Sequence, residues 1–315
     1  MDFEIAPVAL ASVRSTDYRF KVTTSDDFSD LAASIGAVGL LQPPVLTKKD
    51  DEYVIVCGFR RIAACQALKI EHVQARILPA GISRIRCALM AIADNASQRP
   101  LNVIEQSRAY AMIQRHADDG RSWMALARSA GLPDSQSAMD RLLPVVDMPE
   151  MLQKGILAGH IALPVASAIN RLGRQDAAIL THLFTELNTG LSIQRELLET
   201  IGDIALRDGI RIPDLIQRAE IKAVLDNADL SKPQRVHELR RLLKKRRFPE
   251  LSRAEAAFQR ALQSVKLNPQ IHVQPPPFFE GKQYRITMTV DSRRQLKSLM
   301  AELEKLASHS HLLPA

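Results

Sequence analysis

The chain has 315 residues, of which 46% are hydrophobic and only 4% aromatic. This length favours two or three domains, and the apolar content excludes a disordered protein. The net charge of +7 is compatible with a polyanionic partner such as nucleic acid, although basic proteins without such a partner are common. The first residues carry acid where a signal peptide has basic residues, and no apolar run approaches the ~20 residues of a membrane helix. We therefore expect a cytoplasmic protein that does not contact a membrane.

The first hundred residues mix short helices and strands, which predicts a small α/β domain over 1–100. Capped amphipathic patterns and apolar runs predict helices at 25–40, 59–68 and 84–95 and strands at 45–47, 53–57 and 72–78.

A buried strand that ends at Gly58 leads directly into a helix with Arg60 and Arg61 in its first turn. Cations at a helix N-terminus oppose the helix dipole, so both arginines are unfavourable there unless an anion joins them. A phosphate would accept from the first amides of the helix and from two guanidinium groups at once. The alternative is that both arginines are solvated or paired with a carboxylate such as Asp94.

Residues 101–207 consist of short predicted helices, and they contain a helix-turn-helix pattern. Ser122 begins a helix that ends at Ser129, Gly131 supplies the turn, and a second helix runs from Asp134 to Leu143. A second helix that stands clear of the first can enter the major groove of DNA, although an ordinary helical hairpin has the same pattern. The side chains expected to contact bases or phosphates are Ser135, Gln136, Ser137 and Arg141.

The last third of the chain begins with a predicted helical linker, residues 208–265. A long polar helix is expected over 212–248, interrupted at Pro233, and a basic run closes it. These cations are either solvated or in contact with the DNA backbone: Lys244, Lys245, Arg246 and Arg247.

Residues 266–315 change character again and predict strands at 270–273 and 283–290, followed by a helix capped by Asp291-Ser292. A hairpin with one helix is too small to bury its own apolar faces. We therefore expect this module to pack on a second copy, as a dimerisation module, or on the preceding helix.

Three short boxes occur in order along the first part of the chain. They are Gly39-Leu-Leu-Gln-Pro-Pro-Val45, Gly58-Phe-Arg-Arg-Ile-Ala-Ala64, and Asp94-Asn95 followed by Pro100 to Gln106. Together they resemble the ParB/Noc partition family, and Lys154 to Ala162 resembles the segment after the recognition helix of that family. The resemblance implies a mostly α protein with a small α/β N-terminal domain of the ParB/sulfiredoxin-like type, an all-helical helix-turn-helix middle domain and a small α/β C-terminal dimerisation module.

In that family the boxes form a pocket for cytidine triphosphate (CTP), and the resemblance implies the same pocket here. The implied nucleotide-binding residues are Gln42, Gly58, Phe59, Arg60, Arg61, Gln98 and Arg99. Asp94 and Asn95 would present oxygen atoms to Mg²⁺. Phe59 and Asp94 occupy positions where the family has glutamate. Gln98 occupies a position where the family has arginine, and Arg99 follows it by one residue. These departures leave open weaker binding, another nucleotide, or lost hydrolysis.

The implied function is that of a DNA-binding protein for plasmid or chromosome partition. It would bind a palindromic centromere-like site as a homodimer, be gated by CTP and Mg²⁺, and act at the nucleoid or plasmid with a ParA-type ATPase. Slow CTP hydrolysis would reset the switch. Two alternatives are a transcription regulator with a vestigial nucleotide pocket and a phosphotransfer enzyme on the same N-terminal fold. Phe59 argues against a sulfiredoxin, which needs cysteine directly after the motif glycine.

Overall fold

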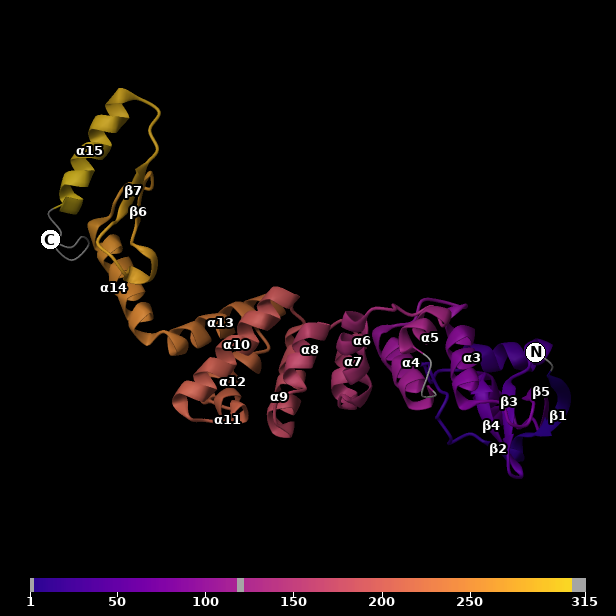
Figure 1. Cartoon of the computed structure of the whole chain (residues 1–315). Coiled ribbons are helices and arrows are strands. Elements are labelled where there is room, and N and C mark those ends of the chain that lie inside the picture. Colours follow the sequence, from indigo (N-terminus) through magenta and orange to yellow (C-terminus); the bar gives the residue numbers. More distant parts are fainter. Residues whose placement is uncertain (1–2, 118–121, 308–315) are drawn as a thin grey trace. The chain divides into compact units, whose positions relative to one another are not determined.

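The computed structural model describes residues 3–117 and 122–307, with side chains up to residue 304 (Figure 1). The chain divides into an N-terminal unit, Met1–Arg171, and a C-terminal unit, Leu172–Ala315. This division differs from the four domains expected from the sequence, because the sheet and the helix-turn-helix fall into one unit.

The N-terminal unit contains a five-stranded sheet in the order β1-β5-β3-β4-β2. Its strands are β1 (Glu4–Ala9), β2 (Val13–Arg14), β3 (Val45–Lys49), β4 (Glu52–Cys57) and β5 (His72–Leu78). β1 with β5 and β3 with β4 are antiparallel pairs, whereas β3 with β5 and β2 with β4 are parallel. The three predicted strands are confirmed as β3, β4 and β5. The sequence did not predict β1, an edge strand that contains Pro7, or the two-residue β2.

Helices cover both faces of this sheet: α1 (Ser29–Val38), α2 (Phe59–Ala67) and α3 (Arg84–Ala96). Because side chains alternate along a strand, Ile55 of β4 packs toward the core that contains α1 and α2, while Val54 and Val56 pack toward the core that contains α3. The helices predicted at 59–68 and 84–95 are confirmed.

The helix predicted over 25–40 is shorter than expected. The side chain of Asp27 accepts a hydrogen bond from the backbone N–H of Ser29 at 2.9 Å, so the helix begins only at Ser29. Gly39, with φ of 81°, ends it. Residues 21–28 have no regular secondary structure, and we call this segment the strap.

The remaining helices of the N-terminal unit are α4 (Val103–His116), α5 (Trp123–Ser129), α6 (Gln136–Leu142), the 3-10 helix η2 (Leu143–Asp147), α7 (Glu150–Leu157) and α8 (Leu163–Ile169). The pair α5–α6, with Gly131 at φ of 73° between them, forms the predicted helix-turn-helix pattern. α6 begins two residues later than predicted, for three reasons. Asp134 pairs with Arg128, the Pro133 carbonyl accepts from the Tyr110 hydroxyl, and Ser135 caps the helix by accepting from the N–H of Ala138.

One hydrophobic core continues from the sheet into the helix-turn-helix. Its members include Val54, Val56, Ala88, Ile92, Tyr110, Leu126, Leu132 and Leu142. Residue 100 is therefore not a boundary between two cores.

The C-terminal unit begins with five helices: α9 (Arg174–Leu187), α10 (Leu191–Asp208), α11 (Ile212–Ile216), α12 (Ala219–Leu225) and α13 (Lys232–Arg247). The predicted long helix over 212–248 is thus three helices. Pro233 lies in the first turn of α13, where proline fits, and does not interrupt it. Val236, Leu239 and Leu243 of α13 are buried, so α13 is a packed element rather than part of a linker.

The chain ends in α14 (Pro249–Val265), an antiparallel hairpin of β6 (Ile271–Gln274) and β7 (Arg285–Met288) with the 3-10 helix η3 (Pro277–Phe279) between its strands, and α15 (Arg293–Ala307). The predicted Ser292 cap is confirmed, since its hydroxyl accepts from the N–H of Gln295 at 3.2 Å. Phe258, Ile271 and Leu299 form a small core, while Ile286, Val290, Leu296 and Met300 stay exposed. Across the described ranges 3–117 and 122–307, no helix combines the length and apolarity needed to cross a bilayer.

Candidate nucleotide pocket

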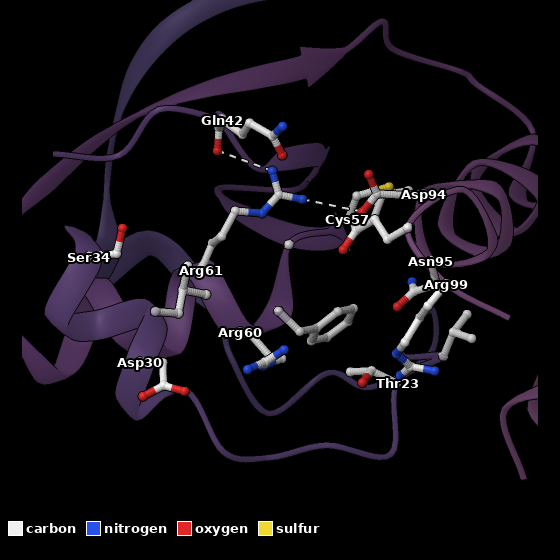
Figure 2. A pocket seen from close by; sticks show the side chains of 16 residues that line it. Thr23, Asp30, Ser34, Gln42, Cys57, Arg60, Arg61, Asp94, Asn95 and Arg99 are labelled. Carbon is white, nitrogen blue, oxygen red and sulfur yellow. Dashed lines mark hydrogen bonds and ion pairs between the residues drawn. The ribbon is translucent and has the colours of Figure 1, made fainter. Parts of the chain in front are cut away.

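A cavity of about 460 Å³ opens at the N-terminus of α2 (Figure 2). Its wall comes from the strap, α1, the loop before β3, the β4–α2 turn and the end of α3. It contains all nine residues predicted from the boxes: Gln42, Gly58, Phe59, Arg60, Arg61, Asp94, Asn95, Gln98 and Arg99. The fold therefore brings together residues from three separate boxes of the sequence.

Gly58 caps α2 in the left-handed conformation, with φ of 95°. A Cβ atom there would lie 2.9 Å from Nε of Arg61 and 3.1 Å from Cβ of Pro44. Glycine is thus required for two reasons, backbone conformation and the close approach of the Arg61 side chain.

The two arginines of the first turn have different surroundings. Arg61 is mostly buried and donates to the carbonyls of Gln42 and Pro43, at 3.1 and 3.2 Å, and to the carboxylate of Asp94 at 3.2 Å. Figure 2 shows its guanidinium group between Gln42 and Asp94. Arg60 is exposed and donates to the Asp27 carbonyl at 2.8 Å. Arg61 is therefore paired with the carboxylate of Asp94, which the sequence had offered as the alternative to a bound anion. The cavity beside this pair still has room for an anion.

Asp94 and Asn95 lie at the end of α3. The Asn95 amide donates to the Ala91 carbonyl at 2.8 Å, which leaves its oxygen as the atom available to a cation. Carboxylate and amide oxygens suit Mg²⁺, which commonly completes its shell with phosphate oxygens and water. Among residues 3–117 and 122–307, His, Cys, Asp and Glu side chains form no cluster of three or more that could hold a metal. A cation beside Asp94 and Asn95 would take its remaining oxygen ligands from a phosphate or from water.

Arg99 lies at the edge of the cavity but is engaged elsewhere. Its guanidinium group makes two hydrogen bonds of 2.7 Å to Glu105, whose side chain is fully buried. Glu105 was not predicted as part of the site, although Asn102 and Glu105 have the spacing of a capping box and do form one.

Further residues of the cavity wall were not predicted, among them Thr23, Asp30, Ser34 and Cys57. Burial, and secondarily the charge of Asp94, raises the pKa of Cys57 to about 12, so its thiol is a neutral part of the wall. All three cysteines, Cys57, Cys65 and Cys87, are free and buried.

The predicted DNA-contacting residues of the helix-turn-helix are all exposed on or beside α6. Ser135 is the cap, and Gln136 donates to Asp140 at 2.7 Å. Ser137 and Arg141 are exposed.

The basic run at the end of α13 is engaged mainly within the C-terminal unit. Arg246 pairs with Asp208 at 2.6 Å, Arg247 pairs with Asp203, and Lys244 with Glu255 at 2.8 Å. Lys244 and Lys245 are exposed, whereas Arg246 and Arg247 are half-buried.

The chain is similar in sequence to several known proteins. The family model of the ParB N-terminal domain matches residues 3–96. The nucleoid occlusion protein of Oceanobacillus iheyensis is 28% identical over 196 residues, which are 61% of this chain and 66% of that protein. That of Bacillus licheniformis is 30% identical over 160 residues, 50% and 54% of the two chains. The probable plasmid-partitioning protein ParB of Thermus thermophilus is 24% identical over 213 residues, 58% and 70%. The matches thus span between about half and 70% of these relatives.

Two solved structures of the C-terminally truncated chromosome-partitioning protein ParB from Caulobacter crescentus are similar to parts of this chain. The complex with the centromeric parS site has 20% identity and a TM-score of 0.36, covering 61% of this chain and 97% of that one. The complex with CTP-gamma-S has 22% identity and a TM-score of 0.28, covering 57% and 98%. Over residues 3–96 the chain carries a ParB N-terminal domain, and the resemblance to the ParB/Noc family is thereby confirmed.

Proposed function

We propose that this protein is a DNA-binding protein of the partition or nucleoid-occlusion kind, and that its N-terminal unit binds CTP together with Mg²⁺. The observation that carries the proposal is the cavity at the start of α2, on which all three boxes converge. The relatives that are named for nucleoid occlusion and plasmid partitioning support the same proposal.

The chemistry of the cavity suits a triphosphate. The amides at the start of α2 and the Arg60 and Arg61 side chains offer donors to an anion, and the tight Gly58 turn lets a ligand approach the backbone. Asp94 and Asn95 would hold the Mg²⁺ ion, which would neutralise part of the phosphate charge. Because Arg61 already lies beside Asp94, cation and guanidinium would share one carboxylate. The cavity wall offers no glutamate next to Gly58, so we assign no catalytic residue for hydrolysis.

For DNA we propose contacts from the exposed polar side chains of α6 and its cap, Ser135, Gln136, Ser137 and Arg141. Of the basic run, Lys244 and Lys245 are proposed to contact the DNA backbone, whereas Arg246 and Arg247 hold α13 on α10. We also propose a homodimer through the C-terminal module, whose hairpin and α15 expose Ile286, Val290, Leu296 and Met300. A ParA-type ATPase is a further proposed partner, by family resemblance alone.

A second candidate is a transcription regulator whose nucleotide pocket is vestigial. The observation that favours it is the engagement of two pocket cations by carboxylates of the chain itself, Arg61 by Asp94 and Arg99 by Glu105. Genome-wide immunoprecipitation with sequencing separates the two. A few sharp peaks with broad flanks indicate a clamp that slides from its loading site, and narrow peaks at promoters indicate a regulator.

The nucleotide pocket is tested by titrating Mg²⁺-CTP into the full chain by calorimetry, with ATP and GTP as controls. We expect saturable CTP binding, and a loss of at least about 100-fold in the double variant R60A/R61A, since each charged hydrogen bond contributes about 1.5–3 kcal/mol. The matched control K48A/K49A removes two exposed cations of the β3–β4 hairpin and should bind normally. Absence of saturable binding below about 1 mM, a free energy near −4 kcal/mol, would refute the pocket.

A further inference from the structure

A second cavity of the N-terminal unit, about 350 Å³ in volume, is bounded by residues 18–26, α4, η2 and α7. It shares no residue with the candidate nucleotide pocket. Its wall is basic, because four of the side chains that line it are cations: Arg19, Lys21, Arg108 and Arg115. The charge that this cavity presents depends on which of the four are neutralised by the chain itself.

Two of these cations are paired with carboxylates. Arg19 donates to Asp17 through Nε at 2.9 Å and also forms an ion pair with it at 2.6 Å. Lys21 pairs with Asp26 at 2.5 Å. Each pair is neutral as a whole, so Arg19 and Lys21 add little net charge to the cavity.

In the described part of the chain, Arg108 is half-buried and its side chain donates only to neutral groups. It uses one nitrogen, Nη1, for the carbonyls of Val22 and Thr23, at 3.4 and 2.6 Å. Among residues 3–117 and 122–307, its guanidinium group has no carboxylate within 4.0 Å. Its Nε and Nη2 atoms have no partner in the same ranges and are not buried, so they remain available to a ligand in the cavity.

The charge of Arg108 is therefore poorly compensated. Burial lowers its pKa, and the more distant carboxylates of Asp26 and Glu105 offset this only in part. Asp26 is engaged by Lys21, and Glu105 is engaged by Arg99. Burial alone would raise the pKa of Glu105, but the bonds from Arg99 and from two backbone N–H groups outweigh it and lower that pKa. An anion bound beside Arg108 would supply the compensation that the chain does not.

Arg115 lies on the same face of α4 as Arg108, because seven residues are close to two helical turns. It is exposed, and within the described ranges its side chain has neither a hydrogen bond nor an ion pair. Ala111, between the two, lines the cavity with a small side chain. The rise from Arg108 to Arg115 is about 10 Å, which two long side chains can span from either end. Both guanidinium groups can therefore reach one ligand.

We propose that this second cavity binds a phosphate group, that of inorganic phosphate or of a phosphate monoester, between Arg108 and Arg115. Two uncompensated cations favour a dianion over a singly charged carboxylate, and a phosphate monoester carries a charge of about −1.5 to −2 at pH 7. Guanidinium groups match phosphate oxygens with paired, charge-assisted hydrogen bonds. A cavity of about 350 Å³ is within the range of small-molecule sites. This inference does not rest on the nucleotide pocket, because the two cavities have no residue in common.

The test measures the binding of radiolabelled inorganic phosphate to the full chain by equilibrium dialysis at constant ionic strength. We expect saturable binding that persists in R60A/R61A, which lacks the two arginines of the nucleotide pocket. R115A and R108A should each weaken it at least about tenfold, because each removes charge-assisted hydrogen bonds to the anion. R86A is the matched control and should bind normally, since Arg86 is an exposed arginine of α3 that does not line the cavity.

Thermal melting shows whether each variant is folded. R108A also removes the bonds to the strap, so R115A decides if R108A does not fold. If R60A/R61A does not fold, the comparison of R115A with R86A decides. Equal affinity for phosphate in R115A and R86A overturns the inference, and so does the absence of saturable binding below about 10 mM. Binding that is lost in folded R60A/R61A places the phosphate in the nucleotide pocket and also overturns the second site.

A duplex from outside the immunoprecipitation peaks serves as the second probe, because the DNA backbone also presents phosphate groups. If R115A weakens duplex binding while no inorganic phosphate binds, Arg115 is a DNA contact and the monoester site is refuted. A failed titration with Mg²⁺-CTP would refute the nucleotide pocket but not this site, so the two proposals fail separately.

Discussion

The cavity at α2 and the basic run of α13 are both rich in arginine, but they use it in opposite ways. At the end of α13, Arg246 and Arg247 pair with Asp208 and Asp203 and so fasten their helix to α10. At the cavity, Arg60 and Arg61 gather at a helix N-terminus, where their charge opposes the helix dipole.

The comparison teaches that a dense run of cations in the sequence need not be free to bind an anion. In α13 the run spans a helix that faces acidic residues, so the chain neutralises much of its own charge. At α2 only two adjacent arginines are present, but a left-handed glycine and a cavity accompany them. Backbone geometry is the more informative signal.

The largest expected effect tests whether α13 is a packed element. Leu239 is fully buried, so L239A should lower the free energy of unfolding by about 3 kcal/mol, measured by chemical denaturation. R241A on the exposed side of the same helix serves as control and should change stability little. Equal, small effects of both changes would mean that α13 is a linker after all, and the contrast with the cavity would fail.

The next effect concerns the geometry of the cavity. G58A should weaken Mg²⁺-CTP binding about tenfold, since the added Cβ displaces Arg61, in addition to costing about 1 kcal/mol of backbone strain. G81A is the matched control, because Gly81 has φ of 82° but open space where a Cβ would lie. Thermal melting should therefore show a similar loss of stability in both variants. Calorimetry should show a loss of affinity for Mg²⁺-CTP only in G58A. A similar affinity loss in both would assign the effect to strain alone.

A smaller effect appears in the pH dependence of stability. The pKa of Glu105 is lower in the folded chain than its ordinary value of 4.5, so the unfolded chain binds more protons as the pH falls. Its stabilisation is complete above that ordinary value and is lost as the pH falls through the lowered pKa. The free energy of unfolding, taken from denaturation curves at several pH values, should accordingly depend less on pH below 4.5 in E105Q than in the unaltered chain. The same pH dependence of the free energy of unfolding in both proteins would show that Glu105 is not held ionised.

The smallest effect is on DNA binding by the exposed lysines of α13. Two phosphate contacts contribute about 1.8 to the slope of log affinity against log salt, so K244A/K245A should lower that slope by up to about 2. K48A/K49A should leave it unchanged. An unchanged slope in K244A/K245A would mean that the whole basic run serves to hold the C-terminal unit together.

Much of the fold followed from local pattern. The strands β3, β4 and β5 and the helices α2 and α3 have strong apolar periodicity and clear breakers, so their positions were predicted nearly to the residue. β1 and β2 were not, because a strand with Pro7 and a strand of two residues form only by pairing with partners distant in the sequence.

The site was predictable as a set of residues but not as a network. The sequence predicted nine of the residues that line the cavity, but spacing does not reveal that Arg61 pairs with Asp94 or that Arg99 pairs with Glu105. Those pairings depend on how α3 and α4 lie against α2 and the strap. In the same way, the start of α6 was misplaced because the contacts of Asp134 and Pro133 come from neighbouring helices.

The continuous core of the N-terminal unit has a consequence for how such proteins diversify. The family match ends at residue 96, but Tyr110, Leu126 and Leu142 still pack in the core that begins at the sheet. A recombination event at that point would join two halves of an interior that did not evolve together. Exchange of segments between relatives is therefore better tolerated at crossovers near residue 171, where the first compact unit ends, than at residue 96.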